Sequence, residues 1–134
     1  DALMFALPLG WAIGRLGCFL IHDHPGRLTN FFMGVRFPGG ARYDLGLYEV
    51  LGLLVYWFIS ILVFRKRAHI VGFYTVALMI FYGIFRFFLD FLRASDLSIS
   101  DTRYLGLTPA QYGSVLLVVA GAYLWYNGKN KNTI

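Results

Sequence analysis

Four long apolar stretches constrain this sequence more than any other feature. Each is roughly 20 residues long, which is the length that an α-helix needs to cross the ~30 Å hydrocarbon core of a bilayer. The stretches cover residues 2–21, 47–64, 70–92 and 108–126. We therefore expect an all-α polytopic membrane protein with about four transmembrane helices, folded as a single membrane domain over residues 1–134.

The composition excludes the soluble alternatives. Apolar residues make up 58% and charged residues 14% of the 134 residues, whereas typical soluble domains have about 45–50% and about 25%. A disulfide scaffold is excluded because Cys18 is the only cysteine. The net charge of +5 would suggest nucleic acid in a soluble protein. Here the basic residues flank membrane spans, so we expect no nucleic-acid partner.

The basic residues also predict the orientation in the membrane. They cluster at residues 65–67, between the second and third spans, and at Lys129 and Lys131 after the fourth. Lys and Arg close to span ends favour the cytoplasm, so we expect residues 65–69 and the carboxyl terminus to be cytoplasmic. The connections over 20–46 and 93–107 are then external. Alternation around Val35 and Phe37 in the first of them is compatible with a small hairpin in a partly ordered loop.

Two arginines inside the apolar stretches predict a site for an anion. Arg15 and Arg86 each lie six residues before the external end of their span, which places both ~9 Å below that surface. Asp90 is the one acid expected to neutralise them within the spans, and it shares a helix face with Tyr82 and Arg86. A phospholipid phosphate fits the two-point donor fork of arginine. The alternative is that the arginines snorkel or pair with an acid for packing.

A polar run, His22-Asp23-His24, follows the first span. The two histidines could be two ligands of a metal, but no third ligand stands at a useful spacing. We therefore expect no metal and no cofactor other than bound phospholipid. Asp23 could act as a general base or orient a histidine, and a solvated turn at the membrane surface explains the same residues equally well. Cys18, alone in an apolar stretch, is typical of an inert core thiol.

Three motifs stand in order on the expected spans. Residues 14–27 read G-R-L-G-C-F-L-I-H-D-H-P-G-R, residues 42–49 read R-Y-D-L-G-L-Y-E, and residues 82–93 read Y-G-I-F-R-F-F-L-D-F-L-R. They resemble the motifs G-R-x-G-N-F-x-N-x-E-x-x-G-R, R-H-P-S-Q-L-Y-E and Y-G-x-x-R-x-x-x-E-x-x-R of the bacterial prolipoprotein diacylglyceryl transferase family. Residues 107–111, L-T-P-A-Q, look like the short stretch before the family's last helix. The resemblance covers nearly the whole chain.

The resemblance implies an enzyme of lipoprotein biogenesis in the bacterial inner membrane. Such an enzyme moves the diacylglyceryl group of phosphatidylglycerol to the lipobox cysteine thiol of a prolipoprotein and releases glycerol phosphate. Position by position, it implies catalytic roles for Arg15, Asp23 and Arg86, with the arginines holding the phosphate and stabilising charge on the leaving group. The residues implied to line the substrate are Gly26, Tyr48, Glu49, Tyr82 and Asp90, to which this chain adds His22 and His24.

Departures from the family pattern keep a second function open. Cys18 and Ile21 replace two asparagines, Asp23 and Asp90 replace glutamates, and residues 43–46 replace H-P-S-Q. The family's amino-terminal half, with its H-G-G-L motif, is absent. We expect this chain to be the carboxyl-terminal portion of a longer, seven-helix-type protein that is an enzyme only at full length. The alternative is a non-catalytic, phospholipid-binding relative that serves as a subunit or scaffold of a larger membrane complex.

Overall fold

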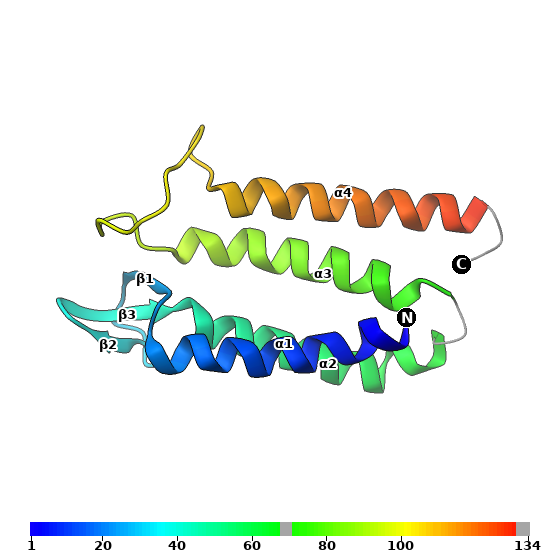
Figure 1. Ribbon diagram of the computed structural model, residues 1–134, viewed down its shortest axis with the longest axis horizontal. Helices are drawn as coiled ribbons and strands as arrows, with labels where there is room; N and C mark the ends of the chain where they lie inside the picture. The colour runs from blue at the N-terminus through cyan, green and yellow to red at the C-terminus, as the bar shows by residue number, and fades with distance from the viewer. Residues whose placement is uncertain (68–70, 131–134) are drawn as a thin grey trace.

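Four long helices form the body of the protein. The computed structural model describes residues 1–67 and 71–130. The helices are α1 (Ala2–Ile21), α2 (Leu45–Leu62), α3 (Phe73–Leu89) and α4 (Pro109–Asn130), with short 3-10 turns η1 (Phe64–Arg67) and η2 (Asp90–Leu92). They run side by side along the long axis (Figure 1). The expected helical membrane fold is confirmed.

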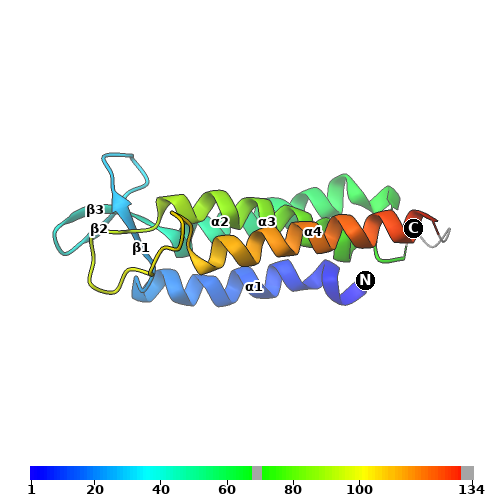
Figure 2. The ribbon, with the colours of Figure 1, turned by 90° about the horizontal axis from the view of Figure 1, so that it is seen from above.

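The helices form two antiparallel pairs, seen one above the other in Figure 1 and from a second side in Figure 2. α1 packs mainly on α2, and α3 packs mainly on α4. Gly83 permits the close approach within the second pair, because a Cβ at this position would lie 2.6 Å from Val118 Cγ2 and 2.9 Å from the Ser114 carbonyl oxygen. Phe5 of α1 meets Tyr74 of α3 edge-on, with ring centroids 5.4 Å apart. Aromatic packing therefore joins the two pairs near the amino-terminal ends of α1 and α3.

Side-chain caps determine where α2 and α4 begin. Asp44 Oδ1 accepts hydrogen bonds from the backbone N–H groups of Gly46 and Leu47, at 3.0 and 3.3 Å. This N-cap starts α2 at Leu45, two residues before the predicted span. At the start of α4, the Thr108 N–H donates to Gln111 Oε1 and the Gln111 N–H donates to Thr108 Oγ1. This reciprocal capping box satisfies two backbone donors and stabilises the start of the helix.

Three helical segments among the described residues are long and apolar enough to cross a membrane. They cover Ala2–Ile21, Leu45–Leu62 and Phe73–Leu92, so the protein crosses the membrane several times. The first agrees with the predicted span, the second lies two residues earlier, and the predicted start of the third, Ile70, lies outside the described residues. α4 is as long as these helices, but polar residues such as Gln111 and Lys129 make it less apolar. The fourth crossing over 108–126 stays a prediction.

A three-stranded antiparallel sheet lies at one end of the helices, here called the sheet end (Figure 1). Its strands are β1 (Pro25–Leu28), β2 (Val35–Phe37) and β3 (Gly40–Asp44), in the order β1-β3-β2. β2 and β3 form a tight hairpin in which Val35 pairs with Arg42 and Phe37 pairs with Gly40. The turn needs glycine, because Gly39 and Gly40 have φ values of 92° and 137°. The expected hairpin is confirmed, and the sheet adds a third strand to it.

A buried arginine ties the sheet to the connection between η2 and α4. Arg42 on β3 donates from Nη1 and Nη2 to the two Asp96 carboxylate oxygens, at 3.0 and 2.6 Å, and from Nη1 to the Gly26 carbonyl oxygen. Gly26 itself lies against the end of η2, where a Cβ would be 2.7 Å from the Leu92 carbonyl oxygen. The absence of a side chain at Gly26 thus lets β1 pack closely on η2.

We predict that the attachment of the sheet weakens in acid. Hydrogen bonding from Arg42 lowers the pKa of Asp96 below its ordinary value. Because the folded-state pKa is the lower one, the ion pair stabilises the fold fully above the pKa of the unfolded carboxyl, about 4, and this contribution is lost as the pH falls through the folded value. Thermal unfolding in micelles at pH 7 and at pH 3 measures this. Asp96→Asn should lose less stability on acidification than the wild type, and equal losses would contradict the prediction.

Candidate functional site

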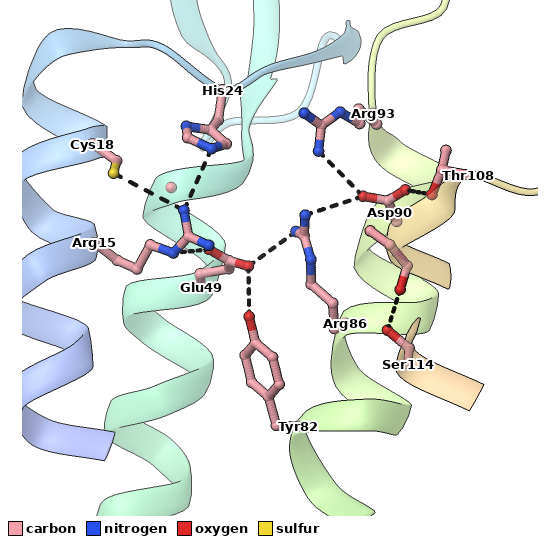
Figure 3. Close-up of polar contacts among 12 residues, drawn as sticks. Arg15, Cys18, His24, Glu49, Tyr82, Arg86, Asp90, Arg93, Thr108 and Ser114 are labelled. Atoms are coloured by element: carbon pink, nitrogen blue, oxygen red, sulfur yellow. Dashed lines mark hydrogen bonds and ion pairs between the residues drawn. The ribbon is translucent and has the colours of Figure 1, made fainter. Parts of the chain in front are cut away.

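A buried carboxylate, Glu49 on α2, is the centre of the polar site (Figure 3). Its side chain is 1% exposed. Arg15 Nε of α1 lies 2.5 Å from Glu49 Oε2, and Arg86 Nη1 of α3 lies 2.9 Å from Oε1. The Tyr82 hydroxyl donates to Oε1 at 3.3 Å. Side chains from two helices, α1 and α3, therefore contact one carboxylate on a third helix, α2.

The position of Glu49 corrects one expectation and supports another. The expectation that Asp90 is the one acid available to the arginines within the spans is wrong, because Glu49, in the second turn of α2, contacts both of them. The expectation that Arg15 and Arg86 lie at one level is confirmed, because both guanidiniums contact the same carboxylate. An i, i+4 ion pair between Arg86 Nη2 and Asp90 Oδ1, at 3.3 Å, adds a second acid.

Asp90 is fully buried and joins the end of α3 to the start of α4. Its Oδ1 lies 3.5 Å from Arg93 Nη1, in addition to its contact with Arg86. Its Oδ2 accepts a short hydrogen bond from the Thr108 hydroxyl. The expected helix face of Tyr82, Arg86 and Asp90 thus continues to Arg93. Thr108, in the cap of α4, contacts the same Asp90 carboxylate (Figure 3).

The partly buried guanidiniums of the network outnumber its buried carboxylates. Three guanidiniums, those of Arg15, Arg86 and Arg93, share the two buried carboxylates of Glu49 and Asp90. A further carboxylate, that of Asp101, lies 3.0 Å from Arg93 Nε, but it is 40% exposed to solvent. Buried charges are costly unless they are paired. The arrangement can therefore accept an anion, for which arginine offers charge-assisted hydrogen bonds.

The outer nitrogen of Arg15 faces a second group of reactive side chains at the sheet end. Arg15 Nη1 lies 3.4 Å from His24 Nε2 and donates to Cys18 Sγ at 4.0 Å. The other ring nitrogen of His24, Nδ1, makes a short contact with Asp23 Oδ1. Cys18 is half-buried rather than enclosed in the core. The structure therefore brings Cys18, Asp23 and His24 together beside Arg15.

Other residues implied to be part of the site lie outside this network. His22 ends α1 in the left-handed conformation, with φ of 52°, and its Nδ1 lies 2.8 Å from Asp44 Oδ2. His22 therefore supports the N-cap of α2 while its neighbour His24 faces Arg15. The Tyr48 hydroxyl is buried and has no hydrogen-bond partner in the part of the chain that the structure describes. Gly26 has the packing role described above.

Thr108 and Gln111 belong to the site but were not predicted as part of it. Both are buried, and the Gln111 side-chain amide also donates to the Phe87 carbonyl oxygen at 3.2 Å. The spacing of a threonine and a glutamine three residues apart, at the start of an apolar stretch, is the signal of a capping box. That signal predicts the helix start, and only the fold shows that the same threonine binds Asp90.

We predict that Thr108→Val destabilises the protein by about 1–3 kcal/mol, because the buried Asp90 carboxylate loses a hydrogen-bond donor. Denaturant unfolding in detergent micelles measures the change. Thr102→Val is the matched control: the same substitution at an exposed position should change stability by less than about 0.5 kcal/mol. Equal effects of the two substitutions would show that the contact with Asp90 is unimportant for stability.

A comparison with known families identifies the relatives of this chain. The family model described as prolipoprotein diacylglyceryl transferase matches residues 1–127. The chain belongs to the prolipoprotein diacylglyceryl transferase family. Its network of Arg15, Glu49, Tyr82 and Arg86 therefore lies in the part of the chain that carries the family match.

Curated relatives of this transferase family are identical to the chain at about a third of the aligned positions. Each of the following is named phosphatidylglycerol–prolipoprotein diacylglyceryl transferase. The relative from Finegoldia magna is 35% identical over 125 residues, covering 92% of this chain and 48% of the relative. The relative from Clostridioides difficile is 33% identical over 140 residues, covering 100% and 52%. The relative from Chlorobaculum tepidum is 33% identical over 125 residues, covering 90% and 43%. The chain spans about half the length of these curated relatives.

Proposed function

We propose that the full-length protein transfers the diacylglyceryl group of phosphatidylglycerol to the thiol of a prolipoprotein lipobox cysteine, and that this chain supplies its phosphate-binding part. The observation that supports the proposal most strongly is the pair Arg15 and Arg86 on one buried carboxylate, at one level, in a network with more guanidiniums than buried carboxylates. The names of the relatives agree with a phosphatidylglycerol substrate.

In this mechanism the guanidiniums of Arg15 and Arg86 hold the phosphate. The acceptor thiol binds next to Asp23 and His24 at the sheet end. The acceptor sulfur attacks the carbon of the diacylglyceryl group that carries the phosphate. A C–S bond forms there, while the C–O bond between this carbon and the phosphate breaks. Glycerol phosphate leaves with the electron pair, and Arg15 and Arg86 stabilise the charge that develops on it. The His24 ring lies beside Arg15 Nη1 and contacts Asp23 through Nδ1, so that this pair can accept the thiol proton.

A non-catalytic phospholipid-binding subunit or scaffold is the second candidate. It is favoured by one observation: Glu49 contacts both arginines, so the network is partly neutralised without a ligand. The full-length wild-type protein, supplied with phosphatidylglycerol vesicles and a lipobox peptide, separates the two. Formation of the diacylglyceryl peptide supports the enzyme. No transfer, combined with phospholipid that copurifies only when Arg86 is present, supports the scaffold.

We also propose that the sheet end faces the outside of the bacterial inner membrane and the carboxyl terminus faces the cytoplasm. Lys66 of η1, at the opposite end from the sheet, is exposed, and Phe32 next to β2 is 85% exposed. His69 and Lys131, also expected on the cytoplasmic side, lie outside the described residues. In a Cys18→Ser background, an impermeant thiol reagent added to whole cells should label Phe32→Cys and spare Lys66→Cys. The reverse labelling would overturn the orientation.

A further inference from the structure

We propose that Cys18, His24 and Asp23 form a nucleophilic thiol site, in which Cys18 accepts an alkyl or acyl group from a carbon electrophile. This chemistry differs from phosphate binding by the arginines and does not rest on the proposed transfer between phosphatidylglycerol and prolipoprotein. Cys18 stands where the family signature has asparagine, so the thiol is a departure of this chain from that signature.

The three side chains are arranged as a nucleophile, a base and a group that orients the base. Cys18 Sγ, a ring nitrogen of His24 and a carboxylate oxygen of Asp23 all lie within 4.8 Å of one another. Asp23 contacts His24 Nδ1, which leaves Nε2 to face Arg15. Figure 3 shows that Cys18 and His24 both contact the Arg15 guanidinium. Nucleophilic thiols in proteins are activated by this kind of oriented imidazole. Their contacts are often loose before a substrate binds.

The position of Arg15 favours thiol chemistry over metal binding at this site. Its Nη1 contacts both Cys18 Sγ and His24 Nε2. A divalent cation held by the same donors would lie against this guanidinium, and the repulsion between them disfavours a metal. Because Cys18 is half-buried and His24 is 21% exposed in its side chain, a small reagent has access to the sulfur.

The reaction is a simple displacement. Cys18 Sγ attacks the electrophilic carbon, a C–S bond forms, and the bond from that carbon to its leaving group breaks with the electron pair on the leaving group. The thiol proton passes to the His24–Asp23 pair, whose carboxylate offsets the charge on the ring, and from there to water or to the leaving group. With iodoacetamide as the probe, the C–I bond breaks, iodide leaves, and Cys18 becomes a stable thioether.

The test is the rate at which iodoacetamide alkylates Cys18 in the full-length protein in detergent micelles, followed by mass spectrometry at neutral pH. The matched reference is the double variant Cys18→Ser/Thr102→Cys, whose single engineered thiol lies on an exposed connection at the same end. We expect Cys18 to react at least about tenfold faster than this reference. His24→Gln should lower the rate at Cys18 to that of the reference or below it, and should leave the reference thiol unaffected.

Added imidazole provides a readout that a merely structural role of His24 would not change. It should restore part of the rate in His24→Gly, because it replaces the missing base, and it should not accelerate the reference thiol. A Cys18 that reacts no faster than the reference, or at a rate independent of His24, would overturn the proposal. So would a thiol that reacts only after treatment with a chelator, because the three side chains would then be metal ligands.

Discussion

Arg86→Ala in the full-length protein should reduce the transfer of diacylglyceryl to a lipobox peptide by about 10²-fold or more. The loss of one donor that stabilises charge in a transition state has effects of this size. Arg86 contacts both buried carboxylates, Glu49 and Asp90, at 2.9 and 3.3 Å, so these two acids orient its guanidinium. Arg86→Lys should recover little of the rate, because an ammonium group lacks the planar two-point fork.

Arg36→Ala is the matched control for this prediction, because it removes an arginine from an exposed position on β2. It should leave transfer within about twofold of the wild type, since substitutions at exposed positions are usually small in effect. Gel filtration in micelles establishes that both variants are folded. Transfer by Arg86→Ala at the level of Arg36→Ala would exclude a role of Arg86 in catalysis.

Glu49→Ala should be the most destabilising single substitution in the polar network. It leaves Arg15 and Arg86 without the carboxylate that they share, on side chains that are 21% and 11% exposed. Removal of one partner from a buried ion pair costs about 3–5 kcal/mol, because the remaining charge is buried and uncompensated. Unfolding by denaturant in detergent micelles measures the loss. Glu49→Gln should fall between the wild type and Glu49→Ala, because it keeps the volume and loses the charge.

Asp101→Asn is the control for the charge effect. Asp101 also contacts an arginine, Arg93, but it is 40% exposed, and exposed ion pairs contribute about 0–1 kcal/mol. Equal stability of Glu49→Ala and Asp101→Asn would show that Glu49 does not compensate the arginines.

If the arginines bind phosphate, phosphatidylglycerol added to the micelles should stabilise Glu49→Ala more than the wild type, because a ligand stabilises the folded state that binds it.

Several features of this protein follow from the sequence alone. Length and hydropathy predict three of the spans, because roughly 20 apolar residues can satisfy their backbone polar groups in lipid only as a helix. The common level of Arg15 and Arg86 follows from the constant rise of a helix along its axis. The β2–β3 hairpin follows from alternation around Val35 and Phe37 and from the glycines that its turn requires.

Only the tertiary structure shows how the side chains of the site meet. The hydropathy pattern starts the second span at residue 47 and so already includes Glu49, but only the packing of the helices places this carboxylate between two arginines. The left-handed turn at His22 separates it from His24, although only one residue lies between them. A sequence specifies positions along a helix, but the distance between side chains on different helices depends on how those helices pack. For this reason the sequence predicted the arginines, and the fold was needed to find the carboxylate between them and the thiol beside Arg15.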